Sequence, residues 1–205
     1  TINVIEDKFN DNLETYYYNL AEHFDQGENY KKAVLYLDKS SDKASGLYDN
    51  RLAAEFYKKL LVILNNSEYS ENILDLNKNK WQAKTTEENK KLDVFIRYQL
   101  GLSNMLFRLG EWDQALVVLE ESLNASKEHE NPLKYAHYCW MMGEIYKLKS
   151  IFDKSHEYLD KGLEHSKKYT ELKDYNEVYI MLSMSLGSLN IDEGNLDQAE
   201  KIFIE

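Results

Sequence analysis

The chain has one cysteine, one proline and only eight glycines in its 205 residues. The lone cysteine, Cys139, excludes a disulfide within the chain, and such sparing use of cysteine suits a reducing compartment, so we expect a cytoplasmic protein. So few helix-breaking residues favour long helices. Alternating strand patterns with hairpin turn residues are also missing, and the predicted fold class is all-α.

An excess of basic charge is missing too. The chain has 25 Lys and Arg against 36 Asp and Glu, which gives a formal net charge of −11. Nucleic-acid binding needs a basic stripe that displaces counterions, so we predict no nucleic-acid partner. No apolar run approaches the roughly 20 residues of a membrane span, and the first residues lack the order of a signal peptide, so we predict no membrane partner either.

The motifs of common catalytic and cofactor sites are missing as well. The chain contains no G-x-x-x-x-G-K-[ST], no G-x-G-x-x-G and no H-E-x-x-H,. His137 and Cys139 stand two positions apart on a predicted helix, where they point about 200° apart and cannot share a metal ion. We therefore predict no catalytic residue, no cofactor and no metal site in this segment, and no enzyme activity unless an attached domain supplies it.

What the chain does contain is a phrase that occurs three times between apolar helical stretches. It reads G-E-W-D-Q-A at 110–115, K-S-I-F-D-K-S at 149–155 and E-G-N-L-D-Q-A at 193–199. Its small residues Ala115, Ser155 and Ala199 are 40 and 44 positions apart. Such a period predicts an α-solenoid, in which helical hairpins stack because none can bury its apolar face alone.

These hairpins resemble the tetratricopeptide repeat (TPR) family, which places small residues where its two helices cross and large residues beside them. The hairpin from 132 onward matches through Met142, Gly143, Tyr146, Phe152, Ser155, Leu159 and Gly162. The hairpin before it matches through Leu102, Ser103, Leu106, Gly110, Trp112, Ala115, Leu119 and Ser122, and the one after it through Leu186, Gly187, Gly194, Leu196, Ala199 and Phe203. In the last hairpin Asn190 stands where the family has an aromatic residue. The first hairpin matches more loosely, through Leu20, Ala21, Phe24, Tyr30, Ala33 and Leu37.

A second resemblance covers residues 18–64. The pairs His23-Phe24 and Lys32-Ala33, the triplet Asp42-Lys43-Ala44 and the segment 53–57 follow one another as in the helical repeat array after the ATPase module of multidomain nucleotide cyclases and related signalling ATPases. We divide the chain into N-terminal hairpins at 1–64, an irregular connecting segment at 65–91, rich in Asn, Lys, Glu and Ser, and regular TPR-like hairpins at 92–205, the last one truncated.

The TPR resemblance implies which residues face a partner, because in that family the first helix of each hairpin lines a concave groove. The matching candidates are Arg97, Leu100, Asn104, Phe107 and Arg108; then His137, Trp140, Glu144 and Lys147; then Met181, Met184, Ser188 and Ile191. Arg97, Arg108 and Trp140 stand out, since Arg and Trp dominate binding hot spots. The alternative is that Trp140 and Phe107 only pack against neighbouring helices.

The leading functional hypothesis is a protein-protein interaction or regulatory segment of a larger cytosolic signalling protein. Its groove would bind a peptide, a partner domain or another domain of the same chain. The alternative is a sensor domain of a transcriptional or phosphatase regulator, in which a solenoid closes around a peptide or small ligand. The exposed half-hairpin after Gly194 further predicts end-to-end self-association.

Overall fold

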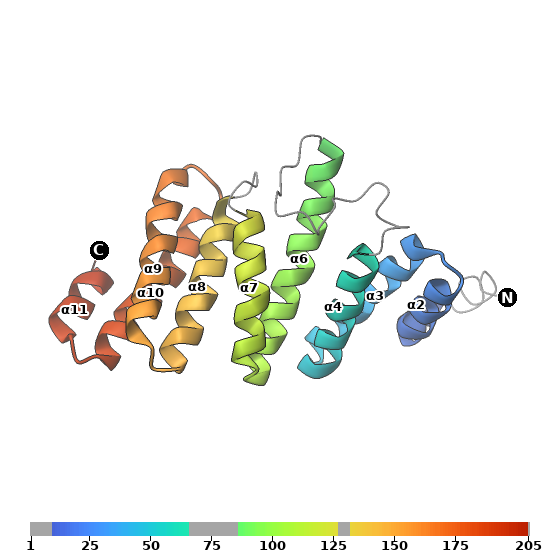
Figure 1. Ribbon diagram of the computed structural model, residues 1–205, viewed down its shortest axis with the longest axis horizontal. Helices are drawn as coiled ribbons and strands as arrows, with labels where there is room; N and C mark the ends of the chain where they lie inside the picture. Colours follow the sequence, from blue (N-terminus) through green and yellow to red (C-terminus); the bar gives the residue numbers. More distant parts are fainter. Residues whose placement is uncertain (1–9, 66–85, 127–131, 205) are drawn as a thin grey trace. The chain divides into compact units, whose positions relative to one another are not determined.

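The computed structural model describes residues 10–65, 86–126 and 132–204, and within these ranges it is all-α (Figure 1). Nine α-helices lie in the described residues, and within each of two units neighbouring helices pack in sequential order as antiparallel pairs, which confirms the predicted fold class. The chain forms two compact units, Thr1–Glu111 and Trp112–Glu205.

The first unit begins with a 3-10 helix, η1 (Asn10–Tyr16), which leads into α2 (Tyr17–Gln26). The helices α3 (Tyr30–Gly46), α4 (Asn50–Asn65) and α6 (Thr86–Leu109) follow. Of the predicted connecting segment 65–91, Asn65 ends α4 and residues 86–91 belong to α6, while 66–85 lie outside the described residues.

The core of the first unit contains the apolar stripes that the sequence shows at three- and four-residue steps. Its most deeply buried apolar side chains, each at most 2% exposed, are Leu20, Ala21, Ala33, Leu37, Ala53, Leu60, Leu92, Ile96, Tyr98 and Leu106. The rings of Phe24 and Tyr36 stack at 5.6 Å between their centroids and join α2 to α3. On the surface, Lys59 of α4 donates to the hydroxyl of Tyr18 at 3.0 Å and to the carboxylate of Glu22 at 3.3 Å, both on α2.

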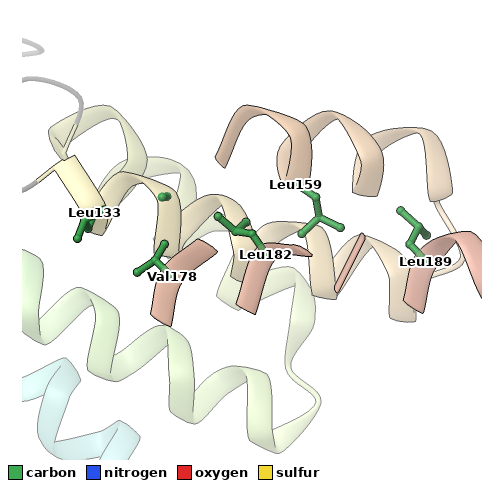
Figure 2. Close-up of a cluster of buried hydrophobic side chains, with 6 residues drawn as sticks. Leu133, Leu159, Val178, Leu182 and Leu189 are labelled. Carbon is green, nitrogen blue, oxygen red and sulfur yellow. The ribbon is translucent and has the colours of Figure 1, made fainter. Parts of the chain in front are cut away.

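The second unit contains α7 (Trp112–Ser126), α8 (Pro132–Leu148), α9 (Phe152–Ser166), α10 (Tyr175–Asp192) and α11 (Leu196–Ile204), with a short 3-10 helix η2 (Lys167–Tyr169) after α9. Its core cluster lies where α8, α9 and α10 meet (Figure 2). The buried members are Leu133, Ala136, Leu159, Val178, Leu182 and Leu189, and Trp140, Phe152, Leu163, Tyr169 and Leu186 pack around them.

Two glycines of the second unit lie where neighbouring helices cross closely. A Cβ on Gly143 would lie 2.6 Å from Cγ of Leu159, and a Cβ on Gly187 would lie 2.4 Å from the ring of Phe203. These are the positions at which the TPR resemblance pairs a small residue on the first helix with a large one on the second. The same crossing therefore builds the α8–α9 and α10–α11 hairpins.

The repeated phrase marks a common turn. In each of the three turns one residue has a left-handed backbone: Gly110 at φ 74°, Ser150 at φ 57° and Gly194 at φ 81°. The amide of the next residue then reaches the carbonyl five positions back, as from Ile151 to Tyr146 at 2.9 Å. This is the bond that closes a Schellman-type helix end. Each copy of the repeated phrase therefore ends one helix and begins the next.

Candidate functional site

The predicted groove residues fall in both units. Arg97, Asn104, Phe107 and Arg108 belong to α6 of the first unit, whereas His137, Trp140, Glu144, Lys147, Met184 and Ser188 belong to α8 and α10 of the second. Each set is described within its own unit. The second set lies together on neighbouring helices.

Arg97 is already engaged inside the first unit. Its guanidinium lies 2.8 Å from the carboxylate of Asp38 on α3, donates to the hydroxyl of Tyr98 at 3.0 Å and lies 4.7 Å from the centre of that ring. Burial and the nearby charge of Asp38 raise the pKa of Asp42, while Arg97 lowers it. Arg97 thus offsets two acidic groups of α3, a role that sequence spacing did not indicate.

The other α6 candidates differ in how far they are available to a ligand. The amide of Asn104 donates to the carbonyl of Leu100, one turn back, at 3.1 Å, which leaves this half-buried side chain tied to its own helix. Phe107 is half-buried, and Arg108 is exposed. Arg97 and Arg108 are the exposed members of the four, and Arg97 is paired with Asp38.

In the second unit, two hydrogen bonds join α8 to α10. The Nε1–H of Trp140 donates to Oγ of Ser185 at 2.8 Å, and the ammonium group of Lys147 donates to Oγ of Ser188 at 3.4 Å. Lys147 also lies 3.0 Å from the carboxylate of Glu144, one turn before it, and the two side chains are only 14% and 16% exposed. Two predicted candidates, Lys147 and Ser188, are therefore in direct contact, while Trp140 bonds to a residue that was not predicted.

The polar groups that join the two helices, those of Trp140, Ser185, Glu144, Lys147 and Ser188, are called the polar seam below. Beside this seam, α10 exposes apolar side chains. Met184 is 59% exposed, Ile180 55% and Ile191 49%. From Val178 to Ile191 the helix contains no Asp, Glu, Lys, Arg or His. A helix that is apolar all round either is buried or offers one of its faces to a partner. The face of α8 and α10 that carries Trp140, Glu144, Lys147, Met184 and Ser188 is named the α8–α10 face below.

His137 borders this face. Its ring centre lies 5.3 Å from that of Trp140, with the two planes tilted by 58°. Burial lowers the pKa of His137 below its ordinary value of 6.5, so the imidazole is neutral near pH 7,. A neutral ring beside the indole suits an apolar face.

This burial predicts a pH dependence of stability. Because folding lowers the pKa of His137, the unfolded chain takes up the proton at a higher pH than the folded chain does. The contribution of the buried neutral ring is complete above the ordinary imidazole pKa and is lost as the pH falls through it towards the lower folded value. We expect the unfolding free energy, measured by urea titration between pH 8 and pH 5, to decline less in His137→Gln than in the wild-type chain. Parallel curves would contradict the burial of His137.

Sequence reasoning missed two features of the second unit. Ser185, 8% exposed, was not among the candidates, although a serine within an apolar helix is itself a signal that its hydroxyl has a partner,. His156 looks like a surface group among charged residues, but its Nε2 lies 2.7 Å from the carboxylate of Glu193 and joins α9 to the end of α10. Cys139 is fully buried, as expected for a small packing residue.

The described residues contain no group of three or more His, Cys, Asp or Glu side chains placed to hold a metal ion. No helix among them is both long and apolar enough to cross a bilayer.

Comparison with known proteins supports the fold. No family model and no curated protein matches the chain. Among chains of solved structure, it is similar to the apo form of RapI, with 18% sequence identity and a TM-score of 0.51. The match covers 98% of this chain but 56% of the RapI chain, so the chain spans little more than half the length of that protein. At this identity the likeness establishes an all-α, TPR-like fold of helical hairpins and not a shared activity.

Proposed function

We propose that this chain is the ligand-sensing part of a regulatory protein, and that the α8–α10 face of its second unit binds a peptide. The observation that carries the proposal is the combination on that face of a half-buried indole, a paired Lys147 and Glu144, and the exposed apolar side chains of α10. Binding energy in peptide complexes is concentrated in a few such anchors.

A peptide suits this face better than a small rigid ligand. The seam offers hydroxyl, ammonium and carboxylate groups spread over two helical turns, which can pair with successive backbone amides and carbonyls,. Met184 and Ile191 lie seven positions apart, roughly 10 Å along the helix axis, which is long enough for several residues of an extended chain. The similarity to a protein solved in a form called apo favours a sensor over a constitutive scaffold.

As a sensor, the chain would act by preferring one conformation when the peptide is bound. A ligand shifts such an equilibrium only by its difference in affinity for the two states. The two hydrogen bonds between α8 and α10 are a place where such a difference can arise, because a bound peptide contacts both helices at once.

The test begins with selection of random linear peptides on the immobilised chain, followed by fluorescence anisotropy with the enriched peptides. We expect micromolar or tighter binding, with hydrogen-exchange protection in α8 and α10. Met184→Gln should weaken binding roughly tenfold, because it places an amide in an apolar contact. Val117 of α7 is 59% exposed, as Met184 is, so Val117→Gln is the matched control and should bind normally.

Failure to enrich any peptide above an unrelated helical protein would contradict the proposal. So would enriched peptides that protect only helices other than α8 and α10.

A further inference from the structure

The indole of Trp140 is restrained from two directions. Its single N–H is used by Ser185 at 2.8 Å, and the ring of His137 lies against it at 5.3 Å. An indole has one donor and no acceptor, so this N–H is not available to a ligand while the bond to Ser185 lasts. What the side chain can still offer is the face of its ring.

Ser185 is placed to impose this orientation. It is 8% exposed and lies on α10, whereas Trp140 is on α8, so the bond spans two helices. Met181 and Ser188 share its side of α10, four residues before it and three after it, whereas Met184 is the preceding residue and points about 100° away. The ring of Trp140 is therefore fixed beside a part of α10 that has no charged residue, while Glu144, four residues further along α8, is paired with Lys147.

We infer that Ser185 is a positioning residue of the proposed peptide site, and that it holds the ring face of Trp140 as the wall of a subsite for an uncharged apolar side chain of the peptide. This inference rests on the proposed function. The ligand class follows from the surroundings: the donor of the indole is occupied, α10 has no charged residue from Val178 to Ile191, and Met184, the residue before Ser185, is exposed. Locking the rotamer in advance lowers the entropy lost on binding.

The test uses the indole N–H resonance of Trp140 in ¹⁵N-labelled protein, assigned with Trp140→Phe, together with the affinity of a peptide enriched in the selection above. Ser185→Ala should move this resonance and lower the affinity roughly tenfold, since the ring is no longer fixed. Ser185→Thr, which keeps the hydroxyl, should restore both. Ser183→Ala, a half-buried serine on the same helix, is the control and should change neither.

A second readout concerns the ligand. One apolar side chain of the bound peptide should show ring-current shifts that disappear in Ser185→Ala, and its replacement by Asn or Lys should cost as much affinity as the loss of Ser185. A purely structural role of Ser185 would lower stability without these changes.

Two results would overturn the inference. Unchanged affinity in Ser185→Ala despite a moved indole resonance would show that the orientation of Trp140 does not matter. Increased affinity would show that the peptide competes with Ser185 for the indole N–H. If no peptide binds the wild-type chain, the proposed function fails instead, and the indole resonance still reports whether Ser185 orients Trp140.

Discussion

Replacing Trp140 by alanine is expected to abolish most peptide binding, with a loss of at least about 30-fold, which corresponds to about 2 kcal/mol. The substitution removes the largest side chain of the α8–α10 face and leaves Ser185 without its donor. The measurement is the dissociation constant of an enriched peptide by fluorescence anisotropy, at a temperature where circular dichroism shows that the variant is folded.

The difficulty is that Trp140 also packs against the core cluster, so its loss lowers stability as well. Phe152 provides a matched control, because it is likewise partly buried against the same cluster but belongs to α9. We expect both alanine variants to lose stability and only Trp140→Ala to lose binding. Equal binding losses in the two would mean that Trp140 acts through the core alone, which is the packing alternative raised by the sequence.

The second large effect concerns the crossing of α8 and α9. Leu159 is fully buried, and Leu159→Ala should lower the unfolding free energy by about 2 to 5 kcal/mol through lost contacts and a cavity,. Gly143→Ala should also destabilise, by about 1 to 3 kcal/mol, because its new Cβ would lie within 2.7 Å of two carbon atoms of Leu159,. The double variant should cost less than the sum by about 1 kcal/mol, since the added methyl group enters the space that the leucine vacates.

This double-mutant cycle is measured by urea unfolding and by hydrogen exchange of the α8 and α9 amides, which reports the local opening free energy. Leu60 of the first unit is also fully buried, so Leu60→Ala combined with Gly143→Ala is the control and should be additive,. Additive costs for Gly143 and Leu159 would contradict the contact between them.

The sequence predicted more of the fold than of the candidate site. The turns were predictable, because a helix stop leaves a local trace in the chain, here a left-handed residue such as Gly110 or Gly194 between two apolar periods. The small-against-large pairing of Gly143 with Leu159 was also predictable, from the TPR resemblance. The start of α6 at Thr86 was not, since the polar residues before Leu92 show no apolar period.

For the site, spacing placed Trp140, Glu144 and Lys147 on one side of α8, because residues three and four apart on a helix are neighbours. It could not show that Arg97 pairs with Asp38, 59 positions away, or that the indole of Trp140 bonds to Ser185, 45 positions away. Contacts between helices depend on how the helices cross, and no local pattern records that.

By itself, then, the sequence determined most of the helices, their turns and the apolar side of helices such as α2, α4 and α9, because these depend on backbone propensity and on the 3.6-residue period,. Only the tertiary structure decided which polar side chains meet. It pairs Arg97 with Asp38 inside the first unit and bonds Trp140 and Lys147 to α10. It also leaves Met184 exposed. The reason is physical. A side chain becomes a binding group or a packing group according to what the neighbouring helix covers, and that is settled only when the hairpins stack.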